Sequence, residues 1–198
     1  MELARLEAMM SQRLMLACGI AAPLTYAIGD FVAGTFSSPG YSFRDQTISE
    51  LGAIGAPSRW LFTAFLVVSY TALATYGVAI WRTADSKRLR FSGALITALG
   101  VMALTVGQFV SMRPRGVEQG AQGASHLIEG LVAMLLLLAA MSLAAAALGR
   151  GFRLYTLATI AAVLIFGGWS SSSIPLVEAG LATPWVGVIE RTFFSWVR

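Results

Sequence analysis

Reactive and charged side chains are scarce in this sequence. Its 198 residues include one cysteine, Cys18, and one histidine, His126, and only 12% of them are charged. A single cysteine excludes an intrachain disulfide and a cysteine-based metal cluster. A single histidine excludes a haem held by two histidines and a zinc site built from three. We therefore expect no cofactor and no dedicated metal site.

Lysine is as rare as cysteine and histidine. Lys87 is the only one, and it lies in a polar stretch between two apolar runs, which excludes a retinal Schiff base inside a helix. A glycine-rich phosphate loop ending in Lys-Ser or Lys-Thr is absent as well. The net charge of +4 comes from basic residues scattered between apolar runs, so nucleic acid is not an expected partner. These features exclude a P-loop ATPase and a rhodopsin.

Long apolar runs dominate what remains. Hydrophobic residues make up 57% of the chain, and its charged fraction is about half the roughly 25% of ordinary soluble domains. Five runs of 21 to 23 residues cover positions 14–36, 60–81, 91–112, 127–148 and 154–174. Each is long enough to cross a hydrocarbon core of about 30 Å as a helix. The runs lack the two-residue alternation of barrel strands, so they predict membrane-spanning helices.

A sixth apolar segment is shorter. Residues 184–197 contain Glu190 and Arg191, and as a helix they would extend about 21 Å, less than a bilayer core. We favour a short sixth helix over one that lies on the membrane surface. The expected fold is one all-α domain over residues 1–198, a polytopic transmembrane bundle of six helices with both termini in the cytoplasm.

Arginine and lysine in the short loops set this orientation. With the N-terminus inside, nine basic residues fall on the cytoplasmic side and four outside, which is the bias that bacterial membrane proteins show. We expect a multi-pass protein of the bacterial cytoplasmic membrane. All five tryptophans fall near predicted helix ends, as in an aromatic belt: Trp60, Trp81, Trp169, Trp185 and Trp196.

Small residues form a stripe on the third predicted helix. Gly93, Gly100 and Gly107 recur every seven residues, with Thr97 and Ser111 on the same face. Such stripes let helix backbones approach closely in lipid, where packing rather than the hydrophobic effect holds helices together. We interpret this stripe as a packing surface.

Polar groups that lipid would penalise gather in the outer half. An ionisable group inside a span costs at least about 2.5–3.5 kcal/mol, and it therefore usually faces partners or water and marks a site. We expect a polar cavity open to the outside, in which Arg191 or Arg115 neutralises a carboxylate. The alternative is a set of structural ion pairs that pin helix ends. The candidate binding residues are Asp30, Glu50, Arg115, His126, Glu129, Glu190 and Arg191.

The loop over residues 37–59 is too apolar for a free linker. Ile48, Leu51 and Ile54 have helical spacing, and Ser49 is a candidate cap for a short helix. Gly52, Gly55 and Pro57 are natural helix breakers that would end it. Irregular backbone at membrane depth is tolerated only when protein buries it or it lines a cavity. The loop therefore predicts a re-entrant or surface-lying segment, or a lid that packs on the bundle.

The same loop carries a family resemblance. Pro-Gly-Tyr-Ser at 39–42, Ile-Ser-Glu-Leu-Gly at 48–52 and Gly-Ala-Pro at 55–57 resemble the prokaryotic membrane family catalogued as domain of unknown function 998. His126 at the start of the fourth helix, and Gly187 with Glu190-Arg191, are further similarities. The likeness extends from about residue 14 to 196. It implies a compact six-helix bundle and no particular activity.

Three functions are compatible with these residues. We prefer a binding protein whose outer cavity takes a small molecule, a lipid head group or an ion. The second is a membrane hydrolase or transferase acting on a lipid-type substrate, with a Ser49, His126 and Asp30 arrangement or a metal held by His126 and Glu129. The third is an assembly subunit of a membrane complex. The bilayer is an expected partner, as is a possible small-molecule or lipid ligand. The sequence identifies neither a protein partner nor an oligomeric state.

Overall fold

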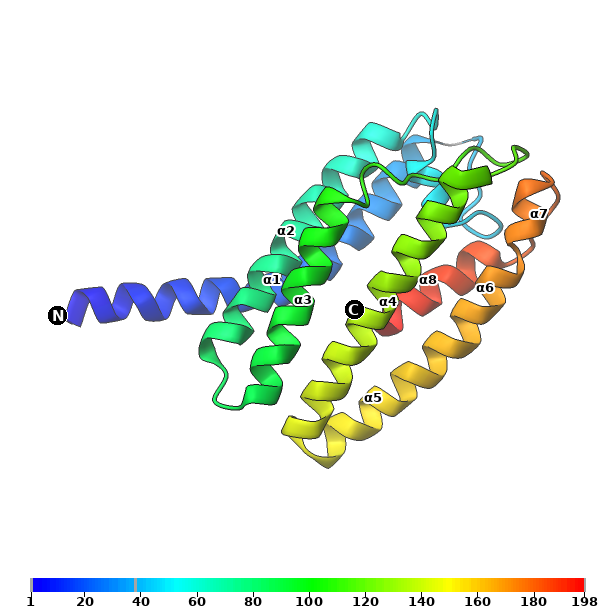
Figure 1. Cartoon of the computed structure of the whole chain (residues 1–198). Coiled ribbons are helices and arrows are strands. Elements are labelled where there is room, and N and C mark those ends of the chain that lie inside the picture. The colour runs from blue at the N-terminus through cyan, green and yellow to red at the C-terminus, as the bar shows by residue number, and fades with distance from the viewer. Residues whose placement is uncertain (1, 38, 198) are drawn as a thin grey trace.

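The computed structural model describes residues 2–37 and 39–197, with the side chains of 3–6, 8, 193 and 195–197 left aside (Figure 1). The described residues form helices and loops and no strand, which confirms the predicted all-α fold. Five helical segments are long and apolar enough to cross a membrane: Met9–Phe36, Arg59–Thr83, Lys87–Thr105, Gly120–Leu148 and Arg150–Glu178.

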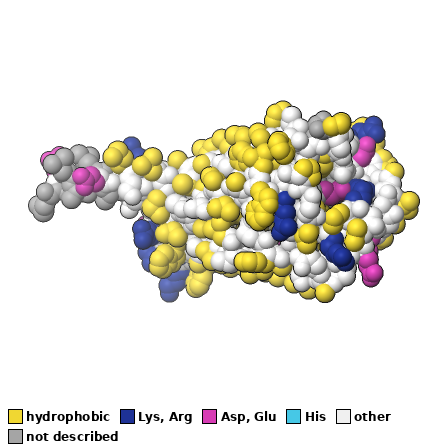
Figure 2. All heavy atoms as spheres, turned by 90° about the horizontal axis from the view of Figure 1, so that it is seen from above, with side chains coloured by type: hydrophobic (Ala, Val, Ile, Leu, Met, Phe, Trp, Pro, Cys, Tyr) yellow, Lys and Arg dark blue, Asp and Glu magenta, His cyan; other side chains and the backbone are white. Residues whose placement is uncertain are grey.

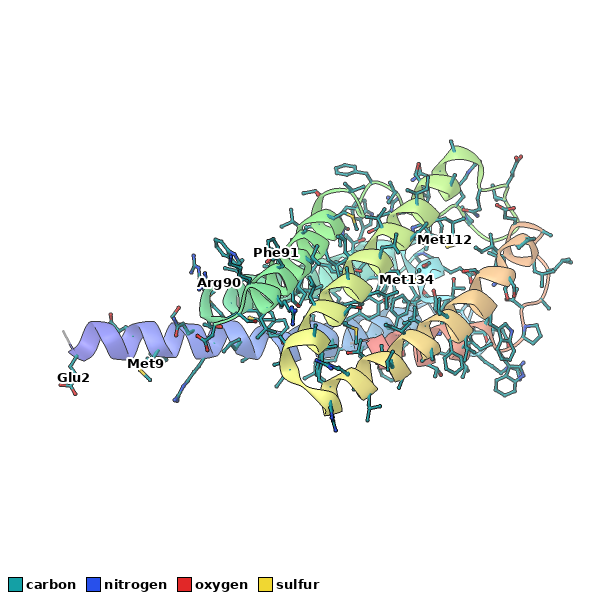
Figure 3. All side chains as sticks on the ribbon, turned by 60° about the horizontal axis from the view of Figure 1, so that its bottom comes forward. Glu2, Met9, Arg90, Phe91, Met112 and Met134 are labelled. Atoms are coloured by element: carbon teal, nitrogen blue, oxygen red, sulfur yellow. The ribbon has the colours of Figure 1, made fainter. Side chains whose placement is uncertain are left out.

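The first four helices form an up-and-down array. α1 (Glu2–Phe36), α2 (Arg59–Thr83), α3 (Lys87–Thr105) and α4 (Gly120–Leu148) each pack on the next helix in the chain. The start of α1 extends beyond the bundle, where Glu2 and Met9 point away from other elements (Figure 3). We call the end with the α2–α3 and α4–α5 turns the basic end. The opposite end, with loops 37–58, 106–119 and 179–185, is the clasp end.

Two tryptophans mark a membrane thickness along α2. Trp60 and Trp81 are 77% and 54% exposed, and they are 21 positions apart (81 − 60) on one continuous helix. That separation equals about 32 Å along the helix axis, close to the thickness of a hydrocarbon core. Trp169 and Trp185 are exposed too, while the side chain of Trp196 lies outside the described residues. The spacing on α2 agrees with an aromatic belt at each interface.

The last third of the chain folds back into the bundle. α5 (Arg150–Ala162), a π-helical turn η2 (Val163–Gly167), α6 (Gly168–Ser172) and α7 (Ile174–Glu178) together form the fifth span. α8 (Val186–Val197) then packs against α5, η2 and α6, and this helix ends midway along the bundle (Figure 1). Its 12 residues extend about 18 Å. The sixth helix is therefore short, and the cytoplasmic position of the termini stays a prediction.

The α3–α4 connection differs from the sequence-based expectation. α3 ends at Thr105 instead of 112, and α4 begins at Gly120 instead of 127. Residues 106–119 form a loop at the clasp end, where Met112 is buried against Ala53 and Val177 (Figure 3). The Met112 carbonyl accepts a hydrogen bond from the Ile54 amide at 2.9 Å. Hydropathy cannot distinguish apolar residues of a packed loop from those of a helix that faces lipid. The predicted third helix therefore extended beyond the true end of α3.

The glycine stripe of α3 is a packing surface against α2. A Cβ atom on Gly93 would lie 2.6 Å from the Gly77 carbonyl oxygen and 2.6 Å from the Trp81 amide nitrogen. A Cβ on Gly100 would lie 2.8 Å from the Ala74 amide nitrogen. The backbones of α2 and α3 therefore touch along this line, as small residues allow in membranes. Gly107 lies beyond the end of α3 and serves a different neighbour.

Replacing Gly93 with Leu is expected to destabilise the protein by at least about 1–3 kcal/mol. The new side chain would meet backbone atoms of α2, which can only move by separating the helices. Gly130→Leu is the matched control, since a Cβ there meets nothing within 4 Å. Unfolding in mixed detergent micelles measures both variants. Equal stability of the two would contradict the close α2–α3 approach.

Candidate functional site

The loop between α1 and α2 is anchored by apolar side chains. Its 3-10 helix η1 (Ile48–Gly52) buries Ile48 and Leu51 against Tyr26 of α1 and Phe62 of α2. Thr47, not Ser49, precedes this helix, and its amide donates to Glu50 Oε2 at 2.8 Å. The prediction that Ser49 caps the helix was therefore wrong by two positions. The loop is a packed element of the fold, and Ser49 is left to contact another helix.

A buried ion pair joins the loop to the first and last helices. Arg191 of α8 donates to both carboxylate oxygens of Asp30 on α1, at 2.8 and 2.7 Å. It also donates to the Phe43 carbonyl at 2.9 Å and to the Tyr41 hydroxyl at 2.6 Å. Asp30 is only 9% exposed. One guanidinium thus fixes α1, α8 and the loop relative to one another, and we call this group the first clasp.

Gly187 allows α8 to approach the loop this closely. A Cβ atom at this position would fall 2.3 Å from the Gln46 carbonyl oxygen and 2.4 Å from that of Phe43. The Gly187 amide donates to the Arg44 carbonyl at 3.0 Å. Any larger residue would push α8 away from the loop and separate Arg191 from its acceptors. The contacts give a physical reason for the Gly187, Glu190 and Arg191 pattern noticed in the sequence.

Glu190 accepts a hydrogen bond from the first amide of η1. Its Oε2 accepts a hydrogen bond from the Ile48 amide at 2.5 Å, and the residue is 8% exposed. A buried backbone amide without a partner would be costly, so this carboxylate satisfies the start of η1. Glu190 and Arg191 are consecutive residues that hold the same loop by different atoms.

A second ion pair fixes the loop from the other side. Arg115, in loop 106–119, donates to both carboxylate oxygens of Glu50 at 2.8 and 2.9 Å. It also donates to the Leu181 carbonyl at 2.8 Å and to Thr183 Oγ1 at 3.0 Å. We call this group the second clasp. It ties the three connections of the clasp end into one unit.

The pKa of Glu50 reflects this environment. Burial by itself raises it, because a charged carboxylate loses water, but hydrogen bonds from Arg115, Gln46 and the Thr47 amide together outweigh burial. The net result is a pKa below the ordinary value of a glutamate. Glu50 is therefore ionised in the folded protein at neutral pH, as a paired carboxylate should be.

A third group lies beside the clasps. His126 of α4 faces Ser49 of η1, with Nε2 3.3 Å from the serine Oγ. The imidazole also interacts with the Val110 backbone, although its buried Nδ1 forms no hydrogen bond of good geometry among the described residues. Glu129 lies about one helical turn further along the same face. A Cβ on Gly107 would be 3.3 Å from Glu129 Oε1, so the missing side chain leaves room for this carboxylate. We call Ser49, His126 and Glu129 the histidine group.

The structure separates the predicted site residues into two groups by their contacts. Asp30, Glu50, Arg115, Glu190 and Arg191 bind one another or the loop backbone, which matches the ion-pair alternative. The carboxylate of Asp30 is held by Arg191, so the Ser49, His126 and Asp30 arrangement is not assembled. Among the described residues no three histidine, cysteine or acidic side chains gather as metal ligands.

Sequence reasoning missed part of the clasps. Tyr41 and Thr183 take part through their hydroxyls, and the Thr183 hydroxyl also donates to the Asp45 carbonyl at 2.7 Å. Tyr41 belongs to the Pro-Gly-Tyr-Ser motif and was available as a signal, whereas nothing local distinguished Thr183. Two grooves lie at the basic end, away from the expected outer cavity.

The fold defines a multi-pass helical membrane protein with a polar network at one end. The chain belongs to the family described as "Protein of unknown function (DUF998)", whose model matches residues 20–197. The resemblance read from the loop motifs is thereby confirmed. No curated protein and no solved structure matches the chain.

Proposed function

We propose that the protein binds a small polar ligand at the histidine group, on the extracytoplasmic side of a bacterial cytoplasmic membrane. The clasps hold the loop that forms one wall of this site. The supporting observation is a contrast among acidic residues. Asp30, Glu50 and Glu190 each have a hydrogen-bonding partner, whereas Glu129, inside a span, has none among the described residues.

This contrast matters because of the membrane. An ionisable side chain in a span is costly unless it is paired or reaches water, so an unpaired one is by default a functional position. Glu129 faces Gly107 and the His126 side of α4, while its neighbours Ile128 and Leu131 are exposed to the lipid side. The carboxylate is thus turned into the protein, and it lacks the arginine that the clasp carboxylates have.

The residue types indicate which ligand fits. A carboxylate accepts hydrogen bonds and attracts cations, His126 can donate or accept, and the Ser49 hydroxyl can do both. The complementary ligand carries a hydrogen-bond donor or a positive charge, such as an amine, a sugar hydroxyl or the ammonium of a lipid head group. The two clasp arginines, Arg115 and Arg191, are paired with carboxylates, so a purely anionic ligand is disfavoured beside them.

Mass spectrometry of molecules released from protein in native nanodiscs tests this proposal. A small molecule or lipid is expected to co-purify with the wild-type chain and with Glu118→Gln, an exposed loop residue. Glu129→Gln and His126→Gln are expected to lose it. Retention of the same molecule by all four proteins would refute the proposal, and an empty preparation that always carries one protein partner would favour an assembly role.

A second candidate is a hydrolase or transferase that acts on a lipid-type substrate. The 3.3 Å approach of Ser49 to His126 favours it, because a serine nucleophile needs a neighbouring base. Among the described residues no acidic side chain orients the imidazole, whose Nδ1 forms no hydrogen bond with a carboxylate. Labelling of Ser49 by a fluorophosphonate, lost in Ser49→Ala and in His126→Gln, would establish this function. Absence of labelling in the wild-type protein would leave binding as the better proposal.

Sidedness has its own test. In a Cys18→Ala background, cysteine at Glu118 is expected to react with a membrane-impermeant maleimide on intact cells. Cysteine at Lys87 is expected to react only after lysis, because the basic end carries the arginine excess of cytoplasmic loops. Both positions are exposed. The reverse pattern would place the clasp end in the cytoplasm.

A further inference from the structure

A groove opens between helices at the basic end, far from the histidine group. It has a volume of about 580 Å³ and separates α2 and α3 from α4 and α5. Its walls are mainly apolar, with Ile80, Ile96, Leu137, Met141 and Phe152 among them. The size falls within the range of small-molecule sites, roughly 300–1,000 Å³. An apolar groove of this size inside a membrane is suited to a hydrocarbon chain.

The groove exists because α4 is lined there with small residues. Ala140, Ala144 and Ala147 form part of its α4 wall, and they keep the helix surface shallow where α2 ends and α3 begins. Leu148 closes the wall at the last turn of α4. The cavity therefore runs from the α2–α3 turn into the apolar half of the bundle, as an acyl chain does below its head group.

Two arginines lie beside this groove, next in sequence to the lining residues Leu89 and Phe152. Arg88 of α3 donates to the Ala146 carbonyl at 3.2 Å, and Arg153 of α5 donates to the Ala145 carbonyl at 3.1 Å. These carbonyls are adjacent in the chain, so both guanidinium groups lie at the same end of α4. Both side chains are exposed, and neither forms an ion pair among the described residues. Each uses one of five N–H donors, leaving others for a ligand.

The surroundings of these two arginines are basic. Lys87 and Arg90 flank Arg88, and the space-filling view has dark blue side chains gathered at this end beside the N-terminal helix (Figure 2). Asp85 lines the groove and is the one acidic side chain in its lining. The balance of charge favours an anion. A phosphate complements the charge of guanidinium groups and accepts their hydrogen bonds.

We propose that this groove binds an anionic phospholipid of the surrounding bilayer, with one acyl chain between α3 and α4 and the phosphate on Arg88 and Arg153. Apolar walls select a lipid tail over a soluble anion, and the arginine pair selects an anionic head group over a zwitterionic one. Basic pockets between helices at a membrane surface bind such head groups in the same way.

Native mass spectrometry of the full-length protein in detergent tests this site. Phosphatidylglycerol and phosphatidylcholine with identical acyl chains are titrated against the wild-type chain, which is expected to bind phosphatidylglycerol more tightly. The double variant R88Q/R153Q is expected to bind phosphatidylglycerol about 25-fold more weakly, or about fivefold for each arginine, with phosphatidylcholine unchanged. R13Q/R82Q removes the same charge from the basic end without touching the groove, and it is expected to resemble the wild type.

A second variant tests the groove itself. Ala147 is exposed and lines the groove, so Ala147→Trp fills the space without disturbing the core and is expected to weaken both lipids. If R88Q/R153Q does not fold, the single variants R88Q and R153Q are measured in the same lipid titration. Equal binding of the two lipids by the wild type would overturn the proposal. So would equal losses in R88Q/R153Q and R13Q/R82Q, or an A147W protein that binds as the wild type does.

Discussion

Replacing Arg191 with Met is expected to lower the free energy of unfolding by about 3–5 kcal/mol. Removal of one partner leaves the other charge buried without compensation, and breaking a buried pair has a cost of this size. Asp30 would lose both of its charge-assisted hydrogen bonds, and the Phe43 carbonyl and Tyr41 hydroxyl would lose theirs. Unfolding in mixed detergent micelles measures the change. Faster proteolysis of loop 37–58 should accompany it.

The partner mutation distinguishes a pair from two independent residues. Asp30→Asn with Arg191→Met is expected to destabilise by much less than the sum of the single changes, since no unpaired charge remains. Arg44→Gln is the control at an exposed pair, and little change is expected there because water screens it. Additive losses at Asp30 and Arg191 would mean that the 2.7 Å contact does not couple the helices.

Replacing Glu50 with Gln is expected to produce the second large effect, again about 3–5 kcal/mol at neutral pH. The pKa of Glu50 is lowered in the folded protein, so the ionised carboxylate contributes stability above its ordinary pKa. This contribution is lost as the pH falls through the lower folded value. The wild-type protein should therefore lose stability below the ordinary glutamate pKa of 4.5, and Glu50→Gln should lose less over the same range. Thermal melting across acidic pH measures both.

Two controls accompany the pH series. Arg115→Met leaves Glu50 buried without its cation, so the pKa of Glu50 should rise and stability should decrease toward neutral pH. Glu118→Gln, at an exposed position, should leave the profile unchanged. Parallel acid profiles for wild type and Glu50→Gln would show that another group controls the transition.

The two clasps explain why a membrane bundle keeps so many buried charges. A buried ion pair does not by itself raise stability over a well-packed apolar pair, but it discriminates strongly against wrong arrangements. Arg191 contacts α1, α8 and loop 37–58, and Arg115 contacts all three connections of the clasp end. Bidentate geometry needs arginine, so lysine at either position should not replace it. The clasps thus fix the loop that brings Ser49 to His126.

The spans could be predicted from the sequence because the bilayer imposes a simple rule on it. Twenty or so apolar residues in a row have one low-energy structure in lipid, a spanning helix, since every backbone group must be satisfied internally. This rule predicted all five spans. The short length and the charged residues of 184–197 indicated a sixth helix that differs from those spans. The rule failed at residues 106–112, which are apolar but belong to a loop, where Met112 is buried by protein.

The pairing of the polar residues was decided only by the tertiary structure. The sequence identified Asp30, Glu129, Glu190 and Arg191 as costly positions, because an unpaired charge inside a span is costly. It could not show that Arg191 pairs with Asp30, across 161 positions, while Glu129 has no hydrogen-bonding partner among the described residues. Hydrogen bonds act over about 3 Å, and the distances between such residues depend on how α8 folds back and how Gly187 lets it approach. Composition thus determined the membrane architecture, and packing determined which charges pair with one another to hold the fold.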